Sequence, residues 1–480
     1  MHRKFTGRVG SSFESVIGKN GLLHHRLDRT TGATRDVLSV GGGCSEVLTG
    51  SRLAKVLKPS FDLQLEMMNS LENDMSANCL SNHTSGGVAQ GLDKFTEALN
   101  PHLPWSNDKQ ITKENNGDDD WFISLQTEGA SAVWAACDLL MQLQHQDNST
   151  LSSTSRRLVA VGARSYHGPG STSFGSASPL GNKPGQISYP VPSILAPPSG
   201  SDLSPETEAM EAIDQWFNTK SDDVAVLLVE PQWGSSQVAL PWNPKVLHHL
   251  VLGAKERGIK VCADEIMCGL GRHGKGGMFA SSTEESGISN LVDAVTFGKA
   301  IAGGCGDLLS GVAVKQGAEL LQSSQRSVLQ SHTYAGASTR ALSIACEVLN
   351  ELPSMTNYVK KGEEIVLKAM NKLEKESNGT IKVQGQGLLW GGIFASLDIK
   401  ERHKAVSIFR THCDRLDVQA YPVGDGFMIT PPLDAALCGG GQGQHLEEAM
   451  DRVVEAALAT VEEMGWLKTP PPPLQMGLLF

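Results

Sequence analysis

Long hydrophobic runs, blocks of basic residues and paired cysteine motifs are all absent from this sequence of 480 residues. No apolar stretch approaches the ~20 residues that span a bilayer, and the N-terminus lacks the apolar core of a secretory signal peptide. The net charge is −11, and lysines and arginines never form a block longer than two or three residues. The sequence therefore favours a small-molecule ligand and argues against nucleic acid or a membrane as partner.

The cysteines are few and scattered, with no C-x-x-C spacing among the nine. Neither a zinc ribbon nor a complete disulfide framework is indicated, so we expect a reducing compartment, the cytoplasm. The first thirteen residues carry Arg3, Lys4 and Arg8 but no acidic residue, which is also a feature of mitochondrial presequences. A mitochondrial location is therefore the alternative to a cytoplasmic one.

The composition is that of a globular protein with a substantial core, since 40% of the residues are hydrophobic and 19% are charged. Segments rich in β-formers alternate with helical patterns, which predicts parallel strands joined by crossover helices. Val224–Val229 is continuously apolar, as expected of a strand buried on both faces. A predicted helix over residues 244–257 and a buried strand over residues 259–263 complete one βαβ unit.

Other segments predict elements outside this unit. Ser204 is the expected N-cap of a helix that runs to about Phe217, and residues 446–466 have the pattern of a closing helix. Residues 470–473 are four prolines, which predict a polyproline-like spacer at the end of the fold. A ligand for a proline-reading domain is the alternative for this tail.

Two residues in the predicted sheet carry a recognisable chemistry. Asp264 follows the strand over residues 259–263, and Lys299 lies thirty-five residues later, in Thr-Phe-Gly-Lys-Ala. An enzyme that holds pyridoxal phosphate needs both groups, because the amine forms an aldimine with the cofactor and the acid keeps the pyridine nitrogen protonated. An acid at a strand end is by itself only a structural feature, but the pair predicts a pyridoxal-phosphate enzyme.

A nucleotide-binding loop is the rival interpretation of the same region. Gly269, Gly274 and Lys275 have nearly the spacing of a phosphate-binding P-loop. However, Gly276 stands where the magnesium-binding serine or threonine should be, and two consecutive glycines are a poor start for the helix that must follow. We therefore reject the nucleotide-hydrolase hypothesis.

Around the two anchors, residues 78–433 resemble the class III (subgroup II) pyridoxal-phosphate aminotransferases. Residues 264–274, Asp-Glu-Ile-Met-Cys-Gly-Leu-Gly-Arg-His-Gly, are similar to the family's Asp-Glu-Val-x-x-Gly-Phe-Gly-Arg-x-Gly segment. The resemblance implies that Asp264 pairs with the pyridine nitrogen, that Ile266 packs against one ring face and that Lys299 is catalytic. Met267 stands where a glutamine often contacts the cofactor in the family. A methionine followed by a cysteine at this position is more similar to the amine:pyruvate and ω-amino acid transaminases.

The resemblance also extends to four residues upstream. Gly129 and Ala130 lie in a segment that partly matches the family's phosphate-binding helix start, where backbone amides hold the cofactor phosphate. Tyr166 and His167 match the family's Tyr-His-Gly, in which the aromatic ring stacks on the other face of the cofactor. All four residues are therefore expected to bind the cofactor.

Two more matches complete the expected site. Glu230 matches the acid of the family's Glu-Pro pair, although a plain charge at a strand end explains it equally well. Thr333 lies in Ser-His-Thr-Tyr-Ala-Gly, which looks like the family segment whose threonine reaches the phosphate of the neighbouring subunit. The resemblance thus implies a homodimer with shared active sites.

Two departures from the family concern the substrate. Many members that use 2-oxoglutarate have a glutamate–arginine switch, and the matching positions here hold Ser235 and Met428. The absence of both the glutamate and the arginine is physically consistent, because either residue alone would be a buried unpaired charge costing several kcal/mol. We therefore expect a small oxoacid or aldehyde as acceptor and an amine or ω-amino acid as donor, unless Arg26 or Arg29 supplies a positive charge.

The predicted fold class is α/β, the fold type I of pyridoxal-phosphate transferases. A large domain (residues 76–335) should contain a mostly parallel sheet of the seven-stranded type, and the N-terminal segment (1–75) should join residues 336–480 in a smaller α+β domain. The predicted reaction is transamination, with Lys299 as base and acid and its amine kept partly neutral by apolar surroundings. Alternatives are an aminomutase, lyase or decarboxylase on the same fold, or a non-catalytic scaffold.

Overall fold

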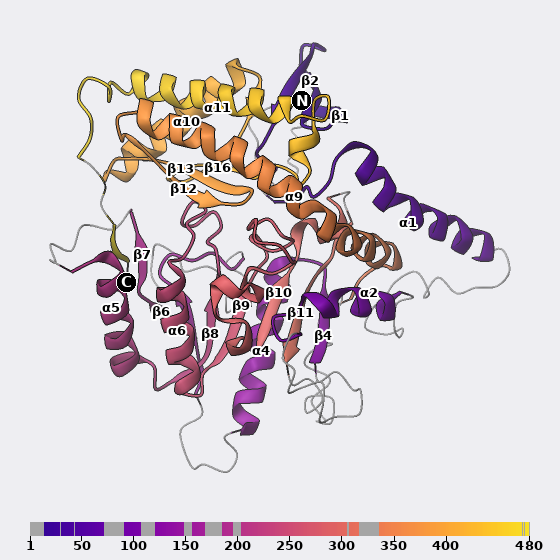
Figure 1. Ribbon diagram of the computed structural model, residues 1–480, viewed down its shortest axis with the longest axis vertical. Coiled ribbons are helices and arrows are strands. Elements are labelled where there is room, and N and C mark those ends of the chain that lie inside the picture. Colours follow the sequence, from indigo (N-terminus) through magenta and orange to yellow (C-terminus); the bar gives the residue numbers. More distant parts are fainter. Residues whose placement is uncertain are drawn as a thin grey trace.

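The computed structural model describes residues 14–28, 30–42, 44–71, 91–106, 121–147, 156–168, 185–194, 203–304, 307–315, 336–472, 474 and 476–479. Its centre is a seven-stranded sheet with the order β4-β11-β10-β9-β8-β5-β6 (Figure 1). The strands are β4 (Trp121–Gln126), β5 (Leu158–Gly162), β6 (Gln186–Tyr189), β8 (Val224–Val229), β9 (Lys260–Asp264), β10 (Ala294–Phe297) and β11 (Ser310–Lys315).

Strand directions in this sheet agree with the sequence prediction. The pairs from β10 through β9, β8 and β5 to β6 are all parallel, whereas β11 runs antiparallel to both β10 and β4. The mostly parallel α/β sheet predicted from the sequence is therefore confirmed.

The βαβ unit predicted around residue 250 forms as expected. Every residue of β8 is buried, and α6 (Pro244–Glu256) starts at Pro244 after an N-cap, Asn243, whose side chain accepts hydrogen bonds from two backbone amides. The helix ends before Gly258, which has a φ of +67° that a residue with a side chain rarely adopts. The chain then enters β9, one residue later than predicted.

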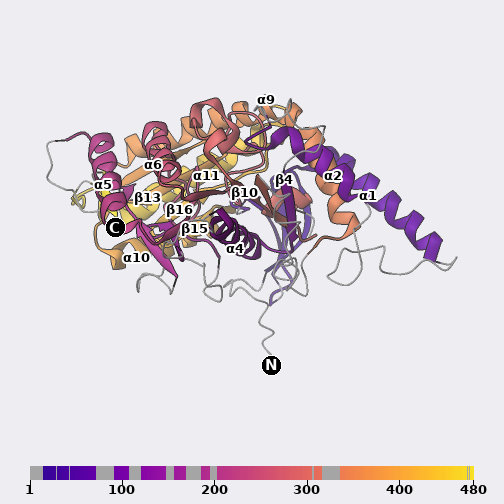
Figure 2. The ribbon, with the colours of Figure 1, turned by 90° about the horizontal axis from the view of Figure 1, so that it is seen from below.

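Helices cover both faces of the large sheet. Figure 2 shows α4 (Gly129–Asp147) on one side of the strands, with α5 (Pro205–Lys220) and α6 on the other. Alternate residues of the strands divide accordingly: Val226 and Leu228 belong to the apolar cluster under α4, and Leu227 and Val229 to the larger one that includes α5 and α6. Burial on both faces explains the continuous apolar run of β8.

A second, four-stranded sheet lies beyond the large one and is wholly antiparallel, in the order β12-β13-β16-β15. Figure 1 shows α10 along it, with α11 packed beside α10, and α11 confirms the predicted closing helix. The elements are β12 (Ile381–Gln386), β13 (Leu389–Phe394), β15 (Tyr421–Val423), β16 (Gly426–Ile429), α10 (Ile399–Arg415) and α11 (Gln444–Glu463).

The N-terminal strands join the C-terminal part of the chain. β1 (Glu14–Asn20), β2 (Leu23–Asp28) and β3 (Thr34–Ser39) form an antiparallel sheet that β14 (Val418–Gln419) extends by pairing parallel to β3. This pairing is compatible with the predicted small domain, whose bounds remain a prediction. The remaining described helices of eight or more residues are α1 (Gly50–Leu71), α2 (Leu92–Leu99) and α9 (Thr339–Glu376).

The C-terminal segment does not end the fold as a spacer, so that prediction was wrong. After the prolines, β17 (Gly477–Leu479) pairs antiparallel with β7 (Val191–Ser193), beside the large sheet. The physical reason is that the segment is apolar past the prolines, and Leu474 is only 7% exposed. Within the described residues, no helix is long and apolar enough to cross a membrane.

Candidate active site

The predicted site lies at the carboxyl edge of the large sheet. Glu230 directly follows β8, Asp264 ends β9, and Lys299 comes two residues after β10. These three strands are parallel neighbours, so their carboxyl ends meet at the same edge. Side chains far apart in the sequence are brought together there, at the usual ligand-binding position of such sheets.

Asp264 is buried and held by three hydrogen bonds. Its Oδ2 is 2.7 Å from Nδ1 of His167, and its Oδ1 accepts from the backbone amide of Ile266 at 3.1 Å and from the hydroxyl of Thr296 at 3.2 Å. Both carboxylate oxygens are thereby fixed in direction. A rigid acid at a strand end is what a protonated pyridine nitrogen requires as partner.

His167 stands behind Asp264 and is fully buried. Burial alone lowers the pKa of this imidazole, but the hydrogen bond to Asp264 and the negative charges of Asp264 and Glu230 outweigh it, so the pKa is raised above its ordinary value. Its Nε2 has no hydrogen-bond partner among the described residues. His167 thus helps to fix the position of Asp264 through Nδ1, while its Nε2 is left without a hydrogen bond to any described residue.

Glu230 is the second acid of the site. Its Oε2 accepts a hydrogen bond from the amide of Gly234 at 3.0 Å, whereas its Oε1 is buried without a partner in the described part of the chain. Burial raises the pKa of this carboxyl well above its usual range, while the charges of His167 and Lys299 oppose the rise. Buried polar atoms are normally satisfied, so this oxygen is available to a polar group of a ligand.

The amino end of α4 lies against the same edge. A Cβ added to Gly129 would lie 3.0 Å from Cγ2 of Ile266, and one added to Gly168 would lie 2.4 Å from the Cβ of Ala130. Gly168 also has a φ of +111°, so only glycine allows both this turn and this contact. The first amides of a helix have no partner within the helix, and those of Gly129 and Ala130 are therefore available to an anion.

Lys299 has an unusual backbone conformation and more exposure than expected. It begins a short 3₁₀ helix, Lys299–Ala302, with a φ of +52°, which costs a non-glycine residue roughly 1–2 kcal/mol. The side chain is exposed in the single chain, whereas the sequence predicted burial among apolar groups. Gly298 and Ala300 on either side are buried, so the exposure is confined to the lysine.

The remaining predicted residues have different outcomes. Ile266 is half-buried, and its Cδ1 would be 3.1 Å from a Cβ added to Gly298, so it lies between α4 and the lysine segment. Tyr166 precedes His167 and is 51% exposed. Thr333 lies outside the described residues. Thr296 was not singled out from the sequence, although its pairing with Asp264 in the β9–β10 register places the two side by side.

The positions expected to choose the substrate border an apolar wall. Met428 is fully buried in a cluster with Cys268 and the partly buried Met267. Gly234, next to Ser235, lies close to Met267, because a Cβ added to Gly234 would lie 2.5 Å from the Met267 sulfur. Of the two arginines considered as substitutes, Arg26 donates to the side chain of Gln419 and Arg29 lies outside the described residues.

The chain belongs to the class-III aminotransferase family, whose pattern it matches over residues 94–432. It is therefore a pyridoxal-phosphate-dependent aminotransferase, and the structure fits the cofactor. The fixed acid Asp264 suits the ring nitrogen, the helix-start amides of Gly129 and Ala130 suit the phosphate, and Lys299 supplies an amine at the same edge.

Two curated proteins illustrate the similarity in sequence. A leucine/methionine racemase of Thermococcus litoralis is 27% identical over 332 residues, which are 65% of this chain and 69% of the racemase. A putrescine–pyruvate aminotransferase of Pseudomonas aeruginosa is 24% identical over 322 residues, which are 62% of this chain and 67% of that enzyme.

Solved structures show the same fold over nearly the whole chain. An (S)-enantioselective ω-transaminase from Thermomicrobium roseum superposes with a TM-score of 0.71 at 18% identity, covering 94% of this chain and 92% of that one. An ω-aminotransferase from Paracoccus denitrificans gives a TM-score of 0.71 at 15% identity, with 96% and 98% covered.

Proposed function

We propose that this aminotransferase moves an amino group from an amine or ω-amino acid to a small oxoacid or aldehyde, with Lys299 as its catalytic lysine. The observation that carries the proposal is the convergence of Lys299, Asp264 and the start of α4 at one edge of the sheet. When bound, pyridoxal phosphate supplies the electron sink for the negative charge that develops at the substrate carbon. Mixing the purified protein with amine donors and a panel of oxoacids, and following amine transfer, tests the proposal.

Each residue has a role that follows from its position. Asp264 would keep a proton on the cofactor's ring nitrogen, because His167 and Thr296 hold its carboxylate in a fixed direction. Lys299 would act as base and then as acid in the 1,3-proton shift, which moves a proton between the substrate carbon and the cofactor carbon on the other side of the nitrogen. Ile266 and Tyr166 would hold the cofactor ring from its two faces and so fix its orientation toward the substrate.

Acceptor choice follows from the apolar wall around Met428. A five-carbon dicarboxylate would bring a second carboxylate to a region where Met428, Met267 and Cys268 offer it no positive charge. We expect kcat/KM for pyruvate to exceed that for 2-oxoglutarate by about tenfold or more. Steady-state assays with one donor and both acceptors measure this ratio.

A matched variant tests the cause of that preference. Met428→Arg combined with Ser235→Glu should raise the relative use of 2-oxoglutarate, whereas Met428→Leu should leave the ratio unchanged. If the unmodified enzyme already prefers 2-oxoglutarate, the proposed substrate class is wrong, and a basic residue from elsewhere must reach the site.

A homodimer with shared sites is the second expectation about this function. Lys299 is exposed in the single chain, and a partner subunit that covers the site would supply the missing enclosure. Thr333 of each subunit is proposed to contact the phosphate in the other, so Thr333→Ala should weaken cofactor retention. Dialysis followed by measurement of bound cofactor gives the size of the loss.

Subunit mixing makes the prediction specific. Heterodimers of Thr333→Ala and Lys299→Ala should contain one site with both lesions and one site with neither, so activity should return on mixing. A fully active monomer, or a mixture that never exceeds the activity of Thr333→Ala alone, would argue against shared sites.

Racemisation is a second candidate, because one of the related proteins is a leucine/methionine racemase. The two reactions differ in their need for an acceptor. A racemase inverts an L-amino acid without any oxoacid, whereas an aminotransferase stops after one equivalent of bound cofactor has been consumed. Chiral chromatography of leucine, methionine and alanine incubated without an acceptor separates these outcomes.

A further inference from the structure

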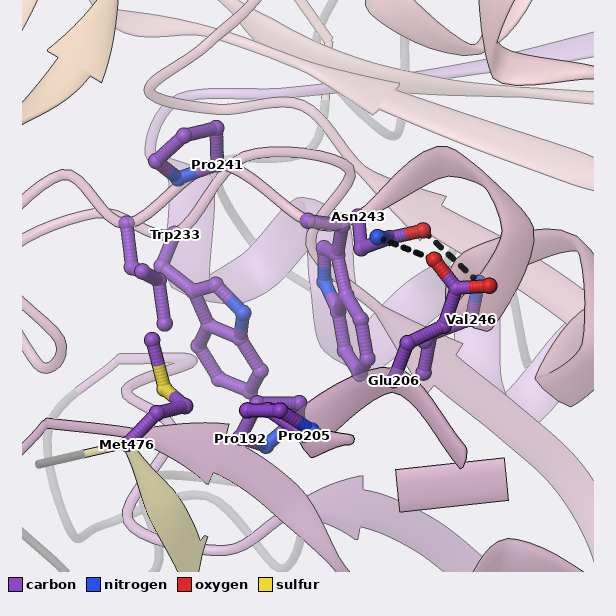
Figure 3. Close-up of a pocket in the computed structure, with 10 residues that line it drawn as sticks. Pro192, Pro205, Glu206, Trp233, Pro241, Asn243, Val246 and Met476 are labelled. Carbon is purple, nitrogen blue, oxygen red and sulfur yellow. Dashed lines mark hydrogen bonds between the residues drawn. The ribbon is translucent and has the colours of Figure 1, made fainter. Parts of the chain in front are cut away.

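A cavity of about 230 Å³ lies apart from the cofactor residues, between the amino ends of α5 and α6 and the C-terminal segment (Figure 3). Its walls are mostly apolar and include Trp233, Trp242, Pro192, Pro205 and Met476. The two indole rings are 5.7 Å apart between centroids and tilted by 31°. None of the residues that we assign to the cofactor lines this cavity.

The polar groups at the rim of the cavity already satisfy one another. Glu206 accepts hydrogen bonds from Asn243 at 2.9 Å and from the Lys245 ammonium at 3.2 Å. The Asn243 oxygen in turn accepts from the first amides of α6, including that of Val246 at 3.4 Å. A ligand therefore finds little unmet charge at this rim.

One polar group in the wall is not satisfied. Trp242 donates its ring N–H to the backbone carbonyl of Glu230 at 2.8 Å, but the ring N–H of Trp233 has no partner among the described residues. Trp233 is only 1% exposed, so water outside the protein does not satisfy this donor. Figure 3 shows the Trp233 ring on one side of the cavity, with Asn243 and Glu206 on the other.

Size and polarity together define the occupant. Apolar cavities of about 150 Å³ hold one aromatic ring, and drug-sized ligands need about 300–1,000 Å³. At about 230 Å³ this cavity suits two fused rings, whose faces can lie against the indoles and prolines. A water molecule needs two to four polar partners, and the wall offers one free donor.

We propose that this cavity binds a small planar aromatic compound of two fused rings, whose hydrogen-bond acceptor receives the ring N–H of Trp233. The cavity is separate from the cofactor residues but adjoins one of them. In the sequence, Trp233 lies between Glu230 and Gly234, and the Gly234 amide donates to the Glu230 carboxylate. The proposal goes beyond transamination and does not depend on which amine the enzyme uses.

Two probes of equal shape test the proposal, namely quinoline, which has a ring nitrogen as acceptor, and naphthalene, which has none. Calorimetry on the pyridoxal-phosphate-loaded protein should show one saturable site, with quinoline binding roughly three- to tenfold more tightly, as expected for one hydrogen bond. Trp233→Phe removes the donor and should make the two affinities equal. Equal affinities in the unmodified protein would overturn the proposal.

A filling variant and a matched control locate the binding. Met476→Trp should occupy the cavity and abolish binding of both probes, whereas Met464→Trp replaces another half-buried methionine, one outside the cavity, and should change neither. Both variants should retain transaminase activity, which shows that they fold. No saturable binding to the unmodified protein, or unchanged binding to Met476→Trp, would overturn the proposal even if Trp233→Phe fails to fold.

Discussion

Borohydride reduction of the cofactor-loaded protein, followed by peptide mapping, should leave the pyridoxyl group on Lys299. The reason is positional, since Lys299 follows β10 at the edge where Asp264 ends β9 and Ile266 reaches Gly298. The change Lys299→Ala should retain the cofactor through Asp264 and the amides of α4. Turnover should fall by about 10²–10⁴ or more, because the residue that moves the proton is lost.

Lys275 provides the matched control for this prediction. It lies in the glycine-rich segment after Asp264, but its ammonium is 2.6 Å from Glu285 and it is not among the residues that converge at the site. Lys275→Ala should therefore keep both the label on Lys299 and normal turnover. A pyridoxyl group on Lys275 or any other lysine would show that the catalytic lysine has been assigned wrongly.

Asp264→Asn should reduce turnover by about 10²–10⁴ at saturating cofactor while the protein remains folded. The amide keeps the shape of the side chain but removes the negative charge that faces the ring nitrogen. It also removes the charge that raises the pKa of His167. Steady-state kinetics, cofactor affinity and thermal unfolding should be measured together, because they separate loss of chemistry from loss of structure.

Asp293 is the control for a purely structural acid. It is buried, and its carboxylate binds the Lys255 ammonium at 2.7 Å and the amide of Val261 at 2.7 Å, away from the cofactor residues. Asp293→Asn should lower the thermal stability but leave kcat nearly unchanged. If Asp264→Asn behaved in the same way, the acid at the end of β9 would be structural after all.

Local sequence patterns were sufficient for much of the fold. A continuous apolar run gave β8, Asn243 and Pro244 mark the start of α6, and Gly258 marks its end. These signals act over a few residues, through burial, capping and allowed backbone angles. Asp264 and Lys299 were predicted as site residues because each follows a predicted strand.

Contacts between distant segments followed less directly from the sequence. The pairing of β14 with β3 and of β17 with β7 joins residues hundreds of positions apart, and the return of the tail was not predicted. The same holds for the bond from Thr296 to Asp264, which depends on the register of two parallel strands. The register of two strands is decided by how the faces of the whole sheet pack, so a short stretch of sequence gives little information about it.

The sequence by itself predicted pyridoxal-phosphate chemistry, because an acid after one buried strand and a lysine after a later one together are the two groups that this cofactor needs. The tertiary structure alone decided how these groups are held: His167 and Thr296 orient Asp264, and Lys299 lies exposed at the sheet edge. It also created the cavity beside Trp233. Cavities and exposure depend on how separate elements pack, so no segment of the sequence contains them on its own.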